Sequence, residues 1–229
     1  MKLINGVRVP LGEEQFLYPE TAKFYDEHAR RFMGPVYRRF AARAAALKLP
    51  GNRVLDIGAG SGLLSIELAK VRPDFHITAI DISEEMLKLA RLNAARAGLT
   101  ARIDFRQAPA AALPFSDSSF DLVASNTSLH LWAAPHTVFR EIARVTAPGG
   151  CLLLWDNLRS GALGPIFSLT GWLLGMNKSQ RSLWLRAIRS SYTLGEARAI
   201  LKESTLKDAR VSCIPRFFML GVAWKKTGF

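Results

Sequence analysis

The residues best suited to binding a ligand form a short glycine-rich run. The apolar segment Val54-Leu55-Asp56-Ile57 is followed directly by Gly58-Ala59-Gly60-Ser61-Gly62. Glycines after a buried strand let the backbone turn tightly and approach a ligand closely at the start of the next helix. Because any tight strand-to-helix turn can use glycines, this run alone is weak evidence for a binding site.

Two acidic residues strengthen the prediction of a binding site. Asp56 stands just before the glycines, at the carboxyl end of the expected strand, where a carboxylate accepts hydrogen bonds from an ammonium group. Asp81 ends the next expected strand, where a carboxylate typically binds the two hydroxyls of a ribose. The glycines also lack the Gly-x-Gly-x-x-Gly spacing of dinucleotide sites. The pattern therefore favours S-adenosylmethionine, which carries a positive group, over NAD.

The elements that position these residues alternate between strands and helices. The expected strands are 54–57, 76–82, 103–105, 120–125 and 151–155, and the expected helices between them include 63–71, 83–98 and 135–145. Such alternation predicts a parallel sheet with right-handed crossovers and helices on both faces. Near the end, 209–214 and 217–224 have no helix between them and predict an antiparallel hairpin turned by Pro215-Arg216. The expected fold class is α/β, with a doubly wound, mostly parallel seven-stranded sheet.

We divide the chain into four parts. Residues 1–49 are expected to form an N-terminal helical cap that is broken around Gly34-Pro35, and residues 50–157 the core that binds the cofactor. Residues 158–205 are expected to form a helical insertion that covers the substrate, and residues 206–229 a hairpin that completes the core sheet. Within the insertion, residues 163–191 and 193–204 are predicted to be helical.

Four segments of the central part resemble class I S-adenosylmethionine-dependent methyltransferases, the group that includes the quinone-biosynthesis C-methyltransferases. They are Val54 to Gly62; Ala79 to Ser83 with Met86; Leu113-Pro114-Phe115 followed by Phe120 to Val123; and Arg140 to Val145 leading into Pro148-Gly149-Gly150. They lie in the family's order and spacing over roughly residues 50–157, which is more specific than any one motif. The resemblance implies a Rossmann-like fold and an enzyme of class EC 2.1.1.

The resemblance also implies the cofactor contacts. Asp56 and Gly58 are expected to contact the methionine portion, Asp81 the ribose hydroxyls, and Ile82 and Met86 the adenine faces. Ala59, Gly60 and Asn126 belong to the same expected set. One departure lies at Pro109, where such enzymes usually carry an Asp that reaches the adenine amino group. Backbone groups of Ala108 and Ala110 are expected to hold the adenine instead, with somewhat lower affinity.

The candidate catalytic residues follow the fourth and fifth expected strands. Asn126, His130 and Asp156 stand where such enzymes present side chains to the methyl group, and His130 is a candidate general base. The alternative is that His130 packs on the loop that follows it. Asp156-Asn157 with Asn126 is similar to the Mg²⁺ ligands of catechol O-methyltransferases, but only one of the three residues carries a charge. No metal is therefore expected.

The flanks must supply the acceptor site, and several of their residues are candidates to contact the substrate. They are Tyr18, Tyr25, Trp172, Arg181 and Arg186. Aromatic residues at helical spacing also occur in cores, and arginines also occur on ordinary surfaces. A small, apolar acceptor that carries a carboxylate or phosphate would use both kinds of residue.

Composition and charge limit the remaining alternatives. The net charge is +12, yet residues 51–157 carry 10 Lys and Arg against 11 Asp and Glu, whereas residues 158–229 carry 12 against 3. Basic flanks suit anionic partners, so an RNA or protein methyltransferase is one alternative. A non-catalytic, cofactor-binding scaffold protein is another, because of Pro109. The chain has only two cysteines, and its longest apolar stretch, 162–176, is too short to span a membrane. These features predict a cytoplasmic protein.

Overall fold

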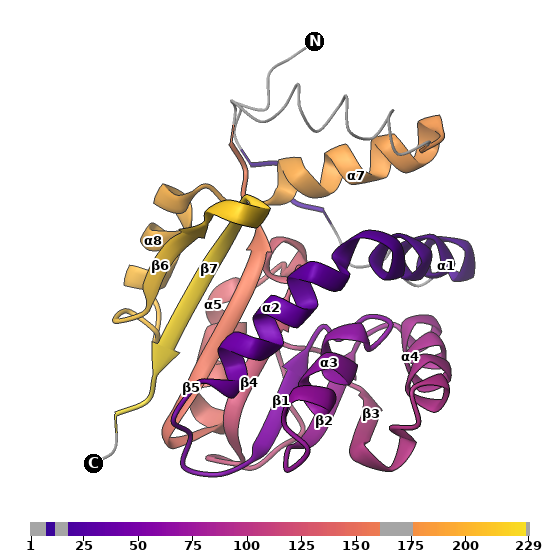
Figure 1. Ribbon diagram of the computed structural model, residues 1–229. Helices are drawn as coiled ribbons and strands as arrows, with labels where there is room; N and C mark the ends of the chain where they lie inside the picture. The colour runs from indigo at the N-terminus through magenta and orange to yellow at the C-terminus, as the bar shows by residue number, and fades with distance from the viewer. Residues whose placement is uncertain (1–7, 12–17, 161–175, 228–229) are drawn as a thin grey trace.

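One seven-stranded sheet runs through the computed structural model, which describes residues 8–11, 18–160 and 176–227 (Figure 1). The strand order is β3-β2-β1-β4-β5-β7-β6. The parallel strands are β1 (Arg53–Ile57), β2 (His76–Asp81), β3 (Ile103–Gln107), β4 (Phe120–Asn126) and β5 (Thr146–Asn157). β7 (Met219–Lys225) is antiparallel to both β5 and β6 (Arg210–Ile214). The predicted sheet, including its antiparallel hairpin, is confirmed.

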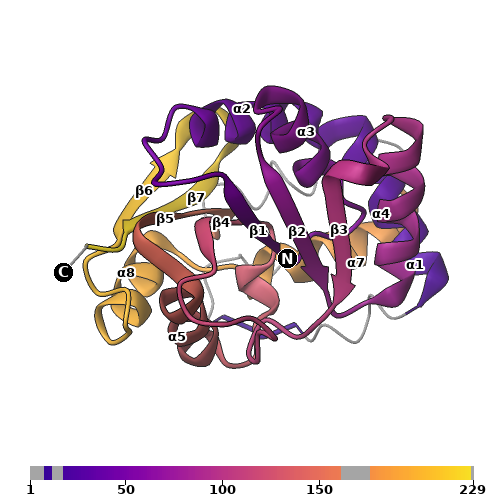
Figure 2. The same cartoon turned by 90° about the horizontal axis from the view of Figure 1, so that it is seen from below.

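Helices cover both faces of the sheet (Figure 2). α2 (Gly34–Ala45), α3 (Leu63–Val71) and α4 (Glu84–Arg96) lie on one face, and α5 (Pro135–Val145) and α8 (Leu194–Lys202) on the other. All seven residues of β4 are buried, as expected for a central strand of a sheet covered on both faces. Each face of the sheet has its own hydrophobic core. One core contains Phe40 and Leu68, and the other contains Phe139 and Leu201.

Local sequence signals set the ends of several helices. Ser83 caps α4, since its hydroxyl accepts a hydrogen bond from the amide of Met86 at 3.2 Å. Gly98, which follows α4, has φ of +69°, a left-handed conformation that glycine adopts without strain. The bounds of α3 and α5 agree with the predicted helices 63–71 and 135–145.

Two elements differ from the predictions. β5 begins at Thr146 rather than Cys151, because Thr146 pairs with Phe120 of β4 and the amide of Gly149 donates to the carbonyl of Lys226. The N-terminal helix is not broken at Gly34-Pro35, because α1 (Pro19–His28) continues through a π-helical turn, η2 (Ala29–Met33), into α2. Pro35 lacks the amide hydrogen that an uninterrupted α-helix would use there, and it stands directly after the π-helical turn, in the first turn of α2.

The carboxyl ends of the parallel strands face α1 and α7 (Lys178–Ser190), which lie beyond this edge of the sheet (Figure 1). α7 forms the last part of the predicted helix 163–191, and residues 161–175 lie outside the described residues. In the part of the chain that the structure describes, no helix is long and apolar enough to cross a membrane. Most of the apolar stretch 162–176 lies outside that part.

Candidate active site

A cavity of about 500 Å³ lies at the carboxyl ends of β1, β2, β4 and β5. Strand order reverses between β1 and β4, and ligands of open α/β sheets bind at such a reversal. The lining contains most of the predicted cofactor residues: Asp56, Gly58, Ala59, Gly60, Asp81, Ile82, Met86, Ala108, Ala110 and Asn126. One cavity therefore brings together predicted residues from four separate segments of the chain.

The glycine loop adopts a conformation that requires glycine. Gly58, Gly60 and Gly62 have φ of +68°, +54° and +77°. A Cβ atom on Gly58 would lie 2.6 Å from the Cβ of Ser128, so the loop approaches the segment after β4 too closely for a side chain there. At Gly60 a Cβ would meet no atom within 4 Å, which leaves that side of the backbone open.

Asp81 joins the glycine loop to the start of α4. One of its carboxylate oxygens accepts a hydrogen bond from the amide of Gly60 at 2.8 Å, and the other from the amide of Ser83 at 2.9 Å. Burial raises the pKa of Asp81, and these amides oppose the rise. A carboxylate has about four acceptor positions, so the two amides leave capacity for a ligand diol.

Asp56 is a buried carboxylate with one unpartnered oxygen. Its side chain is 1% exposed, and Oδ2 accepts a hydrogen bond from the Ser65 hydroxyl at 2.6 Å. Asp56 lines the cavity, and its buried Oδ1 has no hydrogen-bond partner among the described residues. Burial raises the pKa of Asp56 to about 7; the Ser65 hydrogen bond opposes this and the charge of Asp81 adds to it. A cationic ligand would offset the free energy that this burial costs.

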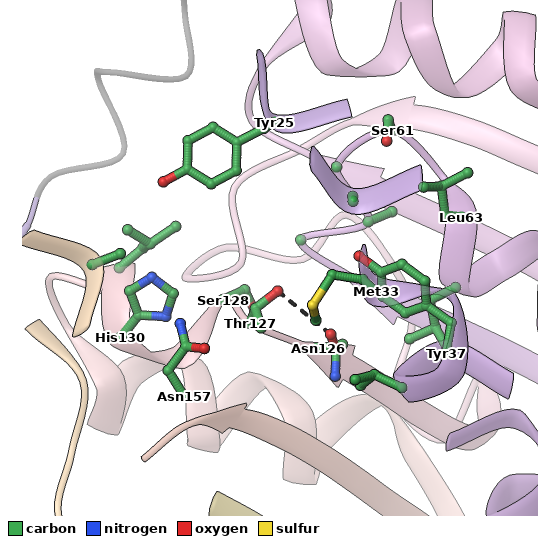
Figure 3. Close-up of a pocket in the computed structure, with 18 of the residues that line it drawn as sticks. Tyr25, Met33, Tyr37, Ser61, Leu63, Asn126, Thr127, Ser128, His130 and Asn157 are labelled. Carbon is green, nitrogen blue, oxygen red and sulfur yellow. Dashed lines mark hydrogen bonds between the residues drawn. The ribbon is translucent and has the colours of Figure 1, made fainter. Parts of the chain in front are cut away.

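The end of β4 has two unusual features, an unpartnered polar atom in Asn126 and a strained backbone conformation in Thr127. Asn126 is 6% exposed, and its Nδ2 has no hydrogen-bond partner among the described residues. Thr127 has φ of +54°, an unfavourable conformation for a β-branched residue, and its hydroxyl lies 3.4 Å from Oδ1 of Asn126 (Figure 3). Such strain persists where the surrounding structure enforces it, often at functional sites.

His130 lies near Asn157 in the cavity lining (Figure 3), and Asp156 holds it through two contacts. Its Nδ1 lies 2.7 Å from Oδ1 of Asp156, and its backbone amide donates to Oδ2 at 2.9 Å. When Asp156 is ionised, this contact places the proton on Nδ1 and leaves Nε2 as an acceptor. His130 lines the cavity, whereas Asp156, 1% exposed, lies behind it. The pair has the geometry of an oriented general base.

Aromatic side chains from α1, η2 and α7 form the opposite wall. His28 contacts the rings of Phe32 and Trp184, with ring centroids 4.9 Å and 5.9 Å apart. Burial lowers the pKa of His28 and raises that of Tyr25, which also lines the cavity. Arg186 of α7 lies near enough to Tyr25 for its charge to lower the pKa of the phenol against that rise.

The other predicted site residues that the structure describes lie outside the lining. Tyr18 is 65% exposed at the N-terminus of α1, and Pro109 stands between Ala108 and Ala110, which do line the cavity. Arg181 and Arg186 lie on α7, beyond the lining. Trp172 lies outside the described residues. Among the described residues, no three His, Cys, Asp or Glu side chains are grouped as a metal site would require.

Several lining residues were not predicted. Tyr37 of α2 is half-buried, and both desolvation and the nearby charges of Asp56 and Asp26 raise the pKa of its phenol. His28 follows Tyr25 at an interval of three residues, which places the two side chains on one helical face. That spacing could have indicated the wall. No comparable signal in the sequence marks Trp184 or Tyr37.

Comparison with known proteins gives a consistent family. Residues 48–167 match the methyltransferase domain family. The 27-O-demethylrifamycin SV methyltransferase of Amycolatopsis mediterranei is 42% identical over 108 residues, which is 47% of this chain and 39% of that protein. A ubiquinone/menaquinone biosynthesis C-methyltransferase of Ectopseudomonas mendocina is 35% identical over 127 residues, 55% of this chain and 49% of that protein. The chain therefore aligns with less than half the length of each of these relatives.

Solved structures match over nearly the whole chain. One, assigned as an S-adenosyl-L-methionine-dependent methyltransferase of Methanococcus maripaludis, has a TM-score of 0.73 and 25% identity, and the match covers 96% of this chain and 98% of that one. A plantazolicin methyltransferase in complex with S-adenosylhomocysteine has a TM-score of 0.72 and 16% identity, with 94% and 93% covered. The second likeness shows the fold alone.

Proposed function

We propose a small, largely apolar acceptor for this chain, which belongs to the methyltransferase domain family and takes its methyl group from S-adenosylmethionine. The observation that carries the proposal is that a single cavity contains the glycine loop with its two carboxylates, the candidate base and the aromatic wall. Methyl transfer from a sulfonium is an in-line displacement, so positioning can supply much of the catalysis.

The residues of the cavity fit the cofactor. The unpartnered Oδ1 of Asp56 is suited to the ammonium group of its methionine portion, and the open side of Gly60 to a closely approaching ligand. Asp81 retains acceptor capacity for the ribose hydroxyls. Ile82, Met86, Ala108 and Ala110 would contact the adenine, with no acidic side chain at position 109. When bound, the cofactor supplies an electrophilic methyl group and leaves as S-adenosylhomocysteine.

His130 would act as the general base. Its Nε2 would take a proton from the acceptor atom, which is a hydroxyl oxygen or an activated carbon atom, as this atom forms its bond to the methyl carbon. The electron pair of the breaking carbon–sulfur bond would go to sulfur. Asp156 would keep the imidazole in the required tautomer and stabilise the imidazolium that forms. Asn126 and Asn157 would orient the acceptor atom.

The acceptor itself would be apolar and compact. The walls supplied by α1, η2 and α7 are mainly aromatic and aliphatic, and the relatives named above act on a rifamycin and on quinone precursors according to their names. An anionic group on the acceptor would lie near Arg186, beside Tyr25, with Arg181 on the same helix. In this assignment residues 1–49 are the cap of the site and residues 158–205 its substrate cover.

A panel of acceptors tests this function. The protein is incubated with S-adenosylmethionine and apolar phenols, enols and hydroxylated aromatic carboxylates, and release of S-adenosylhomocysteine is measured. We expect turnover with some members, loss of turnover and cofactor binding in Asp81→Ala, and neither loss in the exposed control Asp104→Ala. Cofactor binding without turnover on any acceptor would favour a non-catalytic scaffold. Turnover on RNA or protein alone would contradict a small-molecule acceptor.

A further inference from the structure

Arg8 connects the turn that carries His130 to the end of α7. Its Nη2 donates to the backbone carbonyl of His130 at 3.0 Å, and its Nε to the carbonyl of Ser190 at 2.6 Å. The guanidinium lies over the ring of Tyr192, 4.2 Å from the ring centroid. Arg8 lies forty residues before the segment that matches the family, so the family pattern does not include it.

The His130 turn is held from two sides. Asp156 contacts the backbone amide and the side chain of His130, and Arg8 contacts its backbone carbonyl. The turn is a single 3₁₀ segment, η4 (Leu129–Leu131), closed by a hydrogen bond from the amide of Leu131 to the carbonyl of Ser128. Because the turn is this short, the orientation of the imidazole depends on both external contacts.

The second contact of Arg8 holds the end of α7, which forms part of the aromatic wall of the cavity. Ser190 is the last residue of α7, and α7 contributes Trp184 and Ala187 to the cavity lining. The neighbouring residue adds to this connection, since the amide of Val9 donates to the carbonyl of Arg189 at 3.3 Å. In Figure 1 the short segment 8–11 accordingly runs beside α7. Arg8 thus sets the position of the wall relative to the base.

We propose that Arg8 is a positioning residue for methyl transfer, which holds the His130 turn and the end of α7 at the separation that places the acceptor atom against Nε2. This inference rests on the proposed function of His130 as the base. Lysine would not replace arginine fully, because only a guanidinium presents donors in a rigid fork to two carbonyls while it lies flat on a ring. Alanine would leave both carbonyls without this donor.

The test uses the proton on Nδ1 of His130 as a spectroscopic signal. Nδ1 lies 2.7 Å from Oδ1 of Asp156 and the side chain is buried, so in the proposed tautomer its proton should exchange slowly with water and give a resolved downfield proton NMR resonance. The chain has four histidines, so loss of the resonance in His130→Gln assigns it. Wild type, Arg8→Ala, Arg8→Lys and the control Arg39→Ala, an exposed residue of α2, are compared.

We expect the resonance to broaden severalfold or vanish in Arg8→Ala, to change less in Arg8→Lys and to stay unchanged in Arg39→Ala. The affinity for S-adenosylhomocysteine should stay within twofold in all of these variants, which shows that the fold and cofactor site are intact. With an acceptor from the panel, kcat of Arg8→Ala should fall on the order of tenfold or more, as expected from a small misplacement of the base.

Two results would overturn the inference, and they differ in meaning. A wild-type spectrum without the resonance would contradict the His130–Asp156 pair, and with it both the proposed base and the role of Arg8. A resonance that is present in wild type and unchanged in Arg8→Ala would contradict the role of Arg8 alone. If Arg8→Ala fails to fold, Arg8→Lys supplies the same comparison, and a spectrum and kcat equal to wild type would be decisive against the proposal.

Discussion

At the scale of single residues, the buried carboxylate of Asp56 lowers the stability of the folded protein, and its proposed role is to bind the ammonium group of the cofactor. Its side chain is buried, only one of its oxygens is partnered, and its pKa is raised to about 7. A protein without a cationic ligand gains nothing from such a group, since an uncompensated buried charge destabilises the folded state. Asp56 therefore predicts two measurable effects of pH.

The first effect concerns cofactor affinity. Only the ionised carboxylate pairs with an ammonium group, and in the free protein Asp56 is half protonated near pH 7. We expect the affinity for S-adenosylhomocysteine to fall by roughly five- to tenfold between pH 7.5 and pH 6. Calorimetric titration at the two values measures this change. In Asp56→Asn the affinity should be lower and independent of pH; an affinity of wild type that does not vary over this range would contradict the assignment.

The second effect concerns stability. The folded pKa of Asp56 lies above its unfolded value, so its stabilising contribution is fully present below about pH 4 and is lost as the pH rises through about 7. At pH 8 the protein carries a buried charge that Asp56→Asn lacks. Without cofactor, we expect the free energy of unfolding of this variant to exceed that of wild type by about 1–3 kcal/mol at pH 8. At pH 4 the two proteins should have the same free energy of unfolding. Urea unfolding tests it, with Asp104→Asn as the exposed control.

The predictability of the site also differs by residue. Asp56, Asp81 and the glycines follow directly from local sequence, because the strand, the turn and the helix start lie in one short segment. Tyr37 and Trp184 reach the cavity only through the packing of α2 and α7 on distant elements, and no local spacing encodes that packing. The contact between Arg8 and His130 joins residues 122 positions apart and is likewise invisible in the sequence.

At the scale of elements, α1 is tied to the glycine loop by a buried polar link. Nδ2 of Asn93 in α4 donates to Oδ1 of Asp26 in α1 at 2.8 Å and to the carbonyl of Ser61 at 3.0 Å. Asp26 also pairs with Arg30 at 3.1 Å. Since α1 carries Tyr25 and His28, this link connects the aromatic wall of the cavity to the glycine loop.

Removal of the link should weaken both stability and cofactor binding. Asn93→Ala leaves the Ser61 carbonyl unpaired and Asp26 with one partner fewer, so we expect a loss of about 1–3 kcal/mol in the free energy of unfolding and a severalfold loss of affinity for S-adenosylhomocysteine. Asn52→Ala, which removes an exposed hydrogen bond to the carbonyl of Asp74, should change stability by less than about 0.5 kcal/mol. If Asn93→Ala and Asn52→Ala lowered the free energy of unfolding equally, the proposed contribution of the Asn93 hydrogen bonds would be wrong.

The elements themselves show what local pattern can and cannot indicate. The bounds of α3 and α5 agree with the predictions because apolar spacing and flanking Gly or Pro residues define them. β5 extends five residues earlier than predicted, since the segment from Thr146 pairs with β4 and with Lys226 across the fold. The π-helical turn before Gly34 likewise has no signal of its own, and a Gly-Pro pair predicts a break more readily than a continuous helix.

At the scale of the whole molecule, the basic charge lies outside the core that matches the family. Its excess falls on the flanks, and α7, with Lys178, Arg181, Arg186 and Arg189, contains no acidic residue. In Figure 1 this helix lies with α1 beyond the carboxyl edge of the sheet. A small anionic acceptor would be attracted to this region, whereas a polymer would contact only its surface.

This arrangement predicts how nucleic acid affects the enzyme. Because the candidate base and the glycine loop line a cavity beneath α1 and α7, we expect an RNA oligonucleotide to bind weakly and in a salt-dependent manner. Turnover of the small acceptor at physiological salt should remain unchanged. A methyl-transfer assay with and without RNA measures this. Methylation of the RNA itself would favour the alternative class of substrate.

The most direct test of the central claim compares two histidine variants in one kinetic experiment. With the best acceptor of the panel, kcat and the affinity for S-adenosylhomocysteine are measured for wild type, His130→Gln and the exposed control His136→Gln. We expect His130→Gln to lose on the order of a hundredfold or more in kcat, while both variants bind S-adenosylhomocysteine as wild type does. A kcat of His130→Gln equal to that of His136→Gln would contradict this expectation.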